Sequence, residues 1–163
     1  MRAASPPLSR AGAASEEFGA PLGVAVVGLG YWGPNLLRVL ADKPEAEVRW
    51  ICDVDRERLQ RSSGRYRGVR RTTHFERVLA DPGVEAVIIA TPVRTHHALA
   101  AQALQAGKHV FVEKPLAPSS EQADDLVALA GERGRVLMCG HTFIYSPPVR
   151  AIKRMLEAGT LGE

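Results

Sequence analysis

The sequence predicts an α/β fold, a doubly wound parallel sheet with helices on both faces. Three observations predict it: short apolar runs alternate with segments of helical periodicity, the connections between them are short, and a glycine-rich turn directly follows the first apolar run. Alternating strands and helices form right-handed crossovers and a parallel sheet. In such sheets ligands bind beyond the carboxyl ends of the strands, so the residues at those ends decide the function.

Length and composition fit one globular domain with an apolar core. The chain has 163 residues, of which 45% are apolar and 24% charged, and its net charge is +3. This small charge argues against a nucleic-acid partner, and no run is long and apolar enough for a membrane span. Residues 1–20 lack the apolar core of a secretory signal and are expected to be a disordered leader. Cys52 and Cys139 lie in apolar runs, as reduced thiols of a cytoplasmic protein do.

The first half of the chain supplies strands and helices in turn. The expected order is strand, helix, strand, helix and a further strand, over residues 22–27 (LGVAVV), 34–40, 47–52 (EVRWIC), 55–63 and 84–90 (VEAVIIA). The last of these is almost wholly apolar, as expected of a strand covered on both faces. Residues 65–71 (RYRGVRR) are expected to be a solvated basic loop, because they lack the aromatic interleaving of nucleic-acid-binding segments.

The second half continues the alternation. The expected order is helix, strand, helix, strand and helix, over residues 95–106, 108–112, 119–132, 136–139 and 147–158. Thr95 is expected to cap the first of these helices and Gly107 to end it. Ser119 and Gln122 have the spacing of a capping box at the start of the next helix.

The first strand ends in GLGYWG, which has the spacing G-x-G-x-x-G between a strand and a helix. Gly28 permits the tight turn, Gly30 allows the backbone to approach a pyrophosphate, and Gly33 allows close packing of helix on strand. The N-terminus of the following helix then offers unpaired N–H groups to the phosphates. The turn therefore predicts a dinucleotide site of the Rossmann type.

The second strand ends in Asp53, twenty residues after Gly33. An acidic residue at this place accepts hydrogen bonds from the adenosine ribose hydroxyls and repels a 2′-phosphate, so it favours NAD over NADP. Arg56 is the counter-indication, because it lies close enough in sequence to meet a 2′-phosphate. The alternative interpretation of Asp53 is a surface aspartate that ends a strand.

The later strand ends add polar residues to the same edge. Thr91 and Pro92 stop one strand where a cofactor would lie, and His96, which opens the next helix, is a candidate residue of the cofactor cleft. No regular spacing of ligands predicts a metal site. The following strands place further residues at this edge, namely Glu113, Lys114, His141, Thr142 and Tyr145. Lys114 directly follows a buried strand at the ligand edge, and this position favours a role in the site over that of a solvated loop lysine.

These motifs resemble one family. The runs GLGYWG, CDVD, ATPVRTHH, AGKHVFVEKPLA and the final GTLGE are similar to the glucose–fructose oxidoreductase and inositol dehydrogenase (Gfo/Idh/MocA) family, from about Gly23 to the last residue. The runs GYWGPNLLR and GHTFIYSPPVR most resemble the subgroup that oxidises nucleotide-linked amino sugars and their uronates at C3 with NAD. The resemblance implies an oxidoreductase that forms homo-oligomers in its full-length form, and the lack of signal character in residues 1–20 favours the cytoplasm.

The resemblance also implies residue roles. The three glycines with the backbone of Tyr31 and Trp32 would hold the pyrophosphate, and Asp53 the adenosine ribose. The cofactor would further be bordered by Thr91, Pro92 and His96, with Glu113 at the nicotinamide ribose. Lys114 would face the reacting carbon and its oxygen, where the like charge of NAD⁺ favours loss of its proton. His141 and Tyr145 are candidate substrate residues, and the Lys114–Pro115 bond is cis in many members.

The family pattern continues beyond this chain into a second, open-sheet α+β domain that carries much of the substrate pocket. The expected organisation is a leader over 1–20, a dinucleotide-binding domain over 21–145, and the start of the second domain over 146–163. Three hypotheses follow: the cofactor half of an NAD-dependent sugar oxidoreductase, a non-catalytic NAD-binding module or truncated remnant, and an NADP-dependent ketosugar reductase.

Overall fold

The computed structural model describes residues 19–62, 65–66, 68–160 and 162, so the expected leader lies almost wholly outside them. Within this part, one parallel sheet has six strands, β1 (Leu22–Val27), β2 (Ala46–Cys52), β3 (Arg70–Thr72), β4 (Ala86–Ile89), β5 (His109–Val112) and β6 (Leu137–Cys139). The α-helices are α1 (Gly33–Ala41), α2 (Arg56–Arg61), α3 (Phe75–Leu79), α4 (His96–Gln105), α5 (Ser120–Glu132) and α6 (Pro147–Glu157). Two 3₁₀ turns, η1 (Val93–Thr95) and η2 (Thr142–Tyr145), precede α4 and α6.

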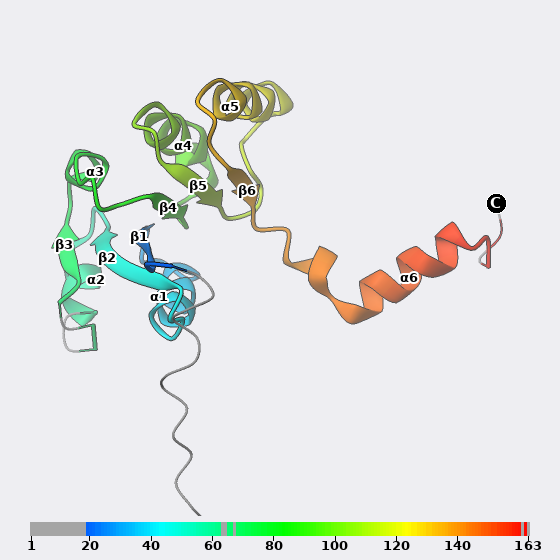
Figure 1. Cartoon of the computed structure of the whole chain (residues 1–163), viewed down its shortest axis with the longest axis horizontal. Coiled ribbons are helices and arrows are strands. Elements are labelled where there is room, and N and C mark those ends of the chain that lie inside the picture. The colour runs from blue at the N-terminus through cyan, green and yellow to red at the C-terminus, as the bar shows by residue number, and fades with distance from the viewer. Residues whose placement is uncertain (1–18, 63–64, 67, 161, 163) are drawn as a thin grey trace, which may run out of the picture.

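The strand order is β3-β2-β1-β4-β5-β6, and all five pairs of neighbouring strands are parallel. This order reverses direction between β1 and β4, which is the switch point where doubly wound sheets bind ligands. Figure 1 shows α1 and α2 on one face of the sheet and α3, α4 and α5 on the other. The predicted fold class, a Rossmann-type doubly wound parallel sheet, is confirmed.

Two apolar cores lie on the two faces of the sheet. Successive residues of β1 alternate between them: Val24 and Val26 pack in the core beneath α1, and Ala25 and Val27 pack in the core beneath α4 and α5. All four are at most 4% exposed. Burial on both faces explains why β1 has no polar side chain.

The strand and helix after α2 were missed by the sequence expectations. Arg70 and Arg71 lie in β3 at the sheet edge, so the prediction of a solvated loop over residues 65–71 is wrong for these two. The Arg70 guanidinium stacks 4.5 Å above the Trp50 ring and pairs with the Asp81 carboxylate. These contacts stabilise a charged residue within β3. Apolar periodicity does not predict this strand.

Helix ends follow the expected chemistry with one exception. Gly107 has φ +74° after α4, and the Ser119 hydroxyl accepts the Gln122 N–H at the start of α5. The exception is Thr95, which makes no side-chain cap bond at α4. Its hydroxyl instead lies 2.7 Å from the Pro92 carbonyl and 2.8 Å from the Thr91 hydroxyl, within the turn that begins the helix.

The last elements extend away from the sheet. Figure 1 shows η2 and α6 leading outward from the end of β6. The apolar side chains of α6 are exposed, namely Val149, Ile152, Met155 and Leu156. The predicted helix over 147–158 is thus confirmed, and its exposed apolar stripe packs on no part of the sheet that the structure describes.

Candidate functional site

The glycine turn between β1 and α1 is built as the sequence predicts. Gly28 has φ +91°, and a Cβ there would lie 2.6 Å from the Ala90 carbonyl oxygen. A Cβ on Gly33 would overlap the Gly28 carbonyl, so helix and turn touch directly. At Gly30 a Cβ would meet only the Arg58 guanidinium, 3.9 Å away, which leaves open space above the turn.

Helix α1 starts with its N–H groups unused by side chains. Its N-cap, Trp32, makes no side-chain cap bond, and the first turn holds no acidic residue. Pro34 fits there because the first N–H groups of a helix have no intrahelical partner. The positive end of α1 therefore faces the open space at Gly30, as a pyrophosphate requires.

Asp53 is buried at the end of β2, with 5% of its surface exposed. One carboxylate oxygen accepts the Leu29 N–H at 2.6 Å, and the other accepts the Asp55 N–H at 2.8 Å. Asp53 thus fixes the glycine turn as well as bordering the cavity, a second role that the motif did not predict. Each carboxylate oxygen can accept a further hydrogen bond, so Asp53 can still bind the hydroxyl groups of a ribose.

The end of β4 is held together by a small polar network. Besides the Thr91–Thr95 contact, the buried His96 ring reaches two backbone carbonyls at 2.8 Å, those of Thr91 and Pro115. His96 borders the cavity, as expected of a cleft residue, and is 1% exposed. Its ring nitrogens are engaged with the protein itself.

Glu113 and Lys114 follow β5 directly. The Glu113 N–H donates to the Ile89 carbonyl at 2.9 Å, which extends the β4–β5 ladder to the rim of the cavity. The side chain of Glu113 is half-buried and that of Lys114 is exposed. The Lys114–Pro115 peptide bond is cis.

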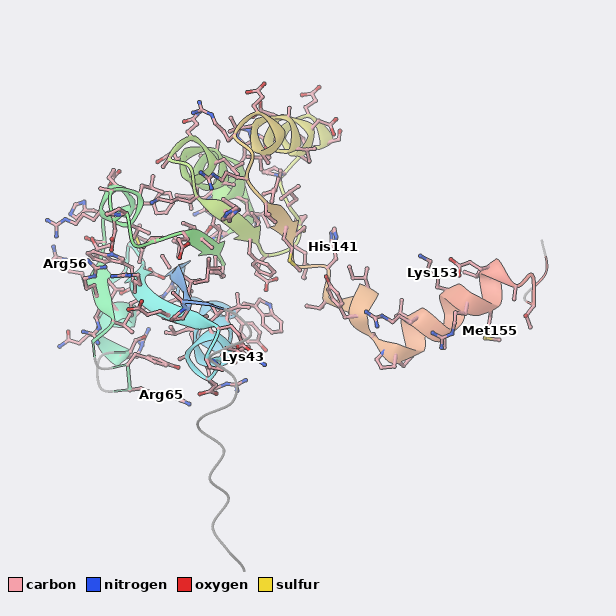
Figure 2. All side chains as sticks on the ribbon, in the orientation of Figure 1. Lys43, Arg56, Arg65, His141, Lys153 and Met155 are labelled. Carbon is pink, nitrogen blue, oxygen red and sulfur yellow. The ribbon has the colours of Figure 1, made fainter. Side chains whose placement is uncertain are left out.

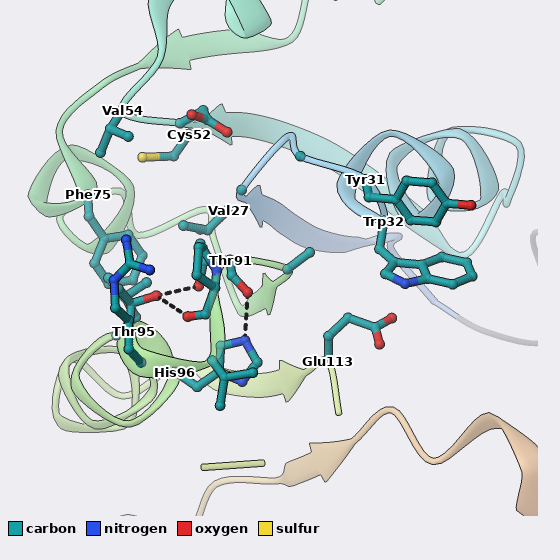
Figure 3. A pocket seen from close by; sticks show the side chains of 18 of the residues that line it. Val27, Tyr31, Trp32, Cys52, Val54, Phe75, Thr91, Thr95, His96 and Glu113 are labelled. Atoms are coloured by element: carbon teal, nitrogen blue, oxygen red, sulfur yellow. Dashed lines mark hydrogen bonds between the residues drawn. The ribbon is translucent and has the colours of Figure 1, made fainter. Parts of the chain in front are cut away.

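These elements enclose one cavity of about 770 Å³ at the β1/β4 switch point. Of the cofactor-site residues expected from the sequence, it is lined by Gly28, Gly30, Tyr31, Trp32, Asp53, Thr91, Pro92, His96, Glu113 and Lys114. Figure 3 shows Cys52, Val54 and Phe75 toward one end of it and Trp32 and Glu113 toward the other. Its volume lies in the range of roughly 300–1,000 Å³ that small-molecule and cofactor sites occupy. The open turn, the free helix end and this volume together fit a dinucleotide.

His141 and Tyr145 do not line this cavity. Both are exposed on the segment that leaves β6, where Figure 2 shows His141. The His141 Nε2 lies 3.4 Å from the Cys139 Sγ, and Arg150 lies over the Tyr145 ring. The structure therefore keeps these two apart from the residues that surround the cavity.

Sequence reasoning missed Arg58 and chose Arg56 in its place. Arg58 lines the cavity, and its guanidinium lies 3.6 Å from the Asp53 carboxylate and 3.3 Å from that of Asp55. Arg56 is exposed at the outer edge of the molecule (Figure 2) and does not line the cavity. A signal was present, because residues three apart share a helix face and Arg58 follows Asp55 by three.

The cavity is also lined by the buried thiol of Cys52. Burial, with the nearby Asp53 and Glu76 carboxylates, raises the pKa of Cys52 to about 12. Burial likewise raises the pKa of Cys139, and the Glu113 carboxylate adds to this. Both cysteines are free thiols.

Two searches of the described residues bear on other classes of site. No group of three His, Cys, Asp or Glu side chains is placed to hold a metal ion. None of the helices in this part is long and apolar enough to cross a membrane.

Residues 22–141 match the model of a protein family described as an oxidoreductase family with an NAD-binding Rossmann fold, GFO_IDH_MocA. The chain belongs to the Gfo/Idh/MocA family. The match covers the whole sheet and the cavity, and the resemblance inferred from the motifs is confirmed.

Known Gfo/Idh/MocA proteins resemble most of this chain. Inositol 2-dehydrogenase 1 of Saccharopolyspora erythraea is 35% identical over 144 residues, which are 86% of this chain and 42% of that protein. The chain spans about two-fifths of the length of the curated relatives it matches.

Two solved structures share the fold and hold different cofactors. GenD2 from gentamicin A biosynthesis, in complex with NAD, has a TM-score of 0.76 and 43% identity, covering 80% of this chain and 37% of its own. KijD10, a 3-ketoreductase from Actinomadura kijaniata in complex with NADP and TDP-benzene, has a TM-score of 0.79 and 34% identity, covering 88% and 44%. NAD is thus a supported cofactor for this fold, and NADP is a possible one.

Proposed function

We propose that the chain is the cofactor-binding part of an oxidoreductase that transfers a hydride between NAD and a carbon bearing a hydroxyl or ketone on a sugar. One observation carries the proposal: a single cavity joins the glycine turn and Asp53 to Glu113 and Lys114. The dinucleotide would lie along it, with the pyrophosphate at the end of α1. The adenosine would then lie near Asp53 and the nicotinamide near Glu113.

The residues of the chain have distinct tasks in this proposal. The bound dinucleotide supplies the hydride acceptor, and the protein orients it. Glu113, anchored through its N–H to β4, would hold the nicotinamide ribose. Lys114 is exposed to the cavity rim, where its amine can hydrogen-bond the substrate oxygen and take or give the hydroxyl proton.

We further propose a nucleotide-linked sugar as the substrate. KijD10 was crystallised with TDP-benzene, and the motif GHTFIYSPPVR resembles the subgroup that acts on nucleotide-linked sugars. His141 and Tyr145, exposed beside β6, are the candidate contacts to that substrate. The matched relatives are longer than this chain, so we place the rest of the substrate pocket, the homo-oligomer contacts and full turnover in a second domain that would begin near residue 146. The two free thiols suit a cytoplasmic setting.

A second candidate is use of NADP. Arg58 lines the cavity beside Asp53, where it partly neutralises the carboxylate that would repel a 2′-phosphate. Arginine is well suited to phosphate because its guanidinium donates several hydrogen bonds in one plane.

Calorimetric titration of the 163-residue chain with NAD⁺ tests the proposal, in parallel with Gly30→Trp and Gly131→Trp. The first variant fills the space above the turn, so binding should be lost. The second places the same side chain on α5, where a Cβ meets nothing within 4 Å, and should bind as the native chain does. A folded native chain that binds neither NAD⁺ nor NADP would overturn the proposal. If the full-length protein binds the cofactor but shows no turnover, the result would support the hypothesis of a non-catalytic NAD-binding module instead.

A further inference from the structure

His96 is a buried titratable residue to which the proposed hydride transfer gives no task. It is the first residue of α4 and is 1% exposed. Its Nε2 lies 2.8 Å from the Thr91 carbonyl oxygen, and its Nδ1 lies 2.8 Å from the Pro115 carbonyl oxygen. Figure 3 shows the contact to Thr91 beside the cavity. The ring therefore bridges the loop after β4 and the loop after β5.

The two contacts constrain the protonation of the ring. A carbonyl oxygen can only accept, so each contact is a hydrogen bond only when the facing ring nitrogen carries a proton. A neutral imidazole has one N–H, and its other nitrogen would direct a lone pair at a carbonyl oxygen. Both contacts can be hydrogen bonds at the same time only when both ring nitrogens carry a proton. The charged groups on the surrounding loops are Arg94, Glu113 and Lys114, and each ring nitrogen faces a carbonyl instead.

The loop that His96 holds contains Lys114. On one side of this lysine, the Glu113 N–H is fixed to the Ile89 carbonyl at 2.9 Å. On the other side, the Pro115 carbonyl is fixed to His96. Lys114 thus lies between two anchors, one from the sheet ladder and one from the His96 ring, and the second anchor ties it to the loop at Thr91 that borders the cavity.

We propose that His96, with both ring nitrogens protonated, is a positioning residue that clamps the β5 loop to the β4 loop and so sets Lys114 relative to the cofactor wall of the cavity. Its importance for catalysis rests on the proposed function. The clamp itself does not, because it is defined by contacts within the chain.

The protonation state is measured on the native chain by nitrogen-15 NMR of labelled histidine rings at neutral pH. The chain has five histidines, and the His96 signals are those that disappear in His96→Gln. The clamp requires a one-bond N–H correlation at both ring nitrogens of His96. A single protonated nitrogen would overturn it, because one of the two contacts would then be no hydrogen bond.

Positioning is separated from simple space-filling by chemical rescue. In His96→Gly, amide hydrogen exchange at Glu113 and Lys114 should rise about tenfold or more, as loss of a hydrogen-bonded anchor implies, while exchange at Ile51 stays unchanged. Added imidazole should restore protection. Pyrazole should not, because it has the same ring size but adjacent nitrogens, which cannot reach carbonyls on opposite sides.

Two results would contradict the clamp: unchanged exchange in His96→Gly, or equal rescue by pyrazole and imidazole. If His96→Gly does not fold, the ring measurement on the native chain decides, and His96→Gln, which supplies one donor, should give intermediate exchange. Neither measurement contains dinucleotide or substrate. Failure of the clamp is therefore distinguishable from failure of NAD⁺ binding in the Gly30→Trp comparison.

Discussion

At the scale of single residues, the site depends on groups that act on the fold and on the ligand together. The Asp53 carboxylate accepts two backbone N–H groups of the turns around it and lies within 3.6 Å of Arg58. The same carboxylate therefore interacts with the turn, with the Arg58 guanidinium and with any ribose that binds. Cofactor preference should follow from the balance of these two side chains.

Asp53→Asn should weaken NAD⁺ binding by about tenfold, because a charged acceptor is replaced by a neutral one of the same shape. Arg58→Ala should instead reduce binding of NADP⁺ more than that of NAD⁺, since it removes the cation beside the ribose position. Arg56→Ala is the matched control and should change neither. Titrations of both cofactors into each variant measure this, with thermal melting to confirm folding, and a stronger effect of Arg56 than of Arg58 would refute the assignment.

Cys52 should resist alkylation although it borders the cavity. With its pKa raised to about 12 it holds about a thousandfold less thiolate than a cysteine with the ordinary value of 9.0. Iodoacetamide at mildly alkaline pH should therefore modify the partly exposed Cys139 first, as peptide mass spectrometry would report. In urea both thiols should react alike, and rapid labelling of Cys52 in the folded chain would contradict its assigned environment.

At the scale of elements, apolar periodicity predicted the central strands and longer helices but not β3 and α3. The strands β1 and β4 are covered on both faces and read as apolar runs, whereas β3 is three residues long and contains Arg70 and Arg71. What places β3 is the contact of Arg70 with Trp50 and Asp81, residues distant in sequence. Such pairing is invisible to a local pattern. The same limit applies to His96, whose ring contacts the Pro115 carbonyl 19 residues further along the chain.

The Asp81 cluster should make stability depend on pH. Burial alone would raise the pKa of Asp81, but the Trp50 indole N–H, the Gly83 N–H and the Arg70 guanidinium outweigh it and lower the pKa below 3.8. A lowered folded-state pKa means that the carboxylate stabilises the fold above the unfolded-state pKa, and that this is lost as pH falls through the folded-state value. Asp81→Asn should therefore cost about 1–2 kcal/mol at neutral pH and less in acid.

Urea unfolding of the native chain and of Asp81→Asn at neutral and acidic pH measures this difference. Asp42→Asn is the control, because Asp42 is exposed after α1. A difference between native and Asp81→Asn stability that stays constant from neutral to acidic pH would contradict the role of the carboxylate charge.

At the scale of the whole molecule, the sheet and cavity form one unit and α6 lies apart from it. Family resemblance predicted a dinucleotide domain and a boundary near residue 146; the boundary stays a prediction, and the apolar side chains of α6 beyond it are exposed. The site residues expected from the motifs include ten of the 21 that line the cavity, because the carboxyl ends of parallel strands meet at one edge. They placed His141 and Tyr145 on the same rim, but the chain leads outward after β6 and neither residue lines the cavity.

Removal of residues 146–163 should leave the fold and cofactor binding intact. Among the described residues, the apolar side chains of α6 contribute nothing to the two buried cores, so the melting temperature should change little. Thermal melting and NAD⁺ titration of the shortened chain test this. A large loss of stability would show that α6 packs on the sheet in solution.

The most direct test of the account is the orientation of bound NAD⁺, measured by isotope-filtered nuclear Overhauser contacts between the ligand and the labelled chain. The account predicts contacts from the nicotinamide protons to the side chains of Glu113 and Lys114, and from the adenosine protons to Val54. Gly30→Trp should abolish both sets. Nicotinamide contacts at Val54, or ligand contacts outside the cavity, would contradict the claim that this cavity presents the nicotinamide to Lys114.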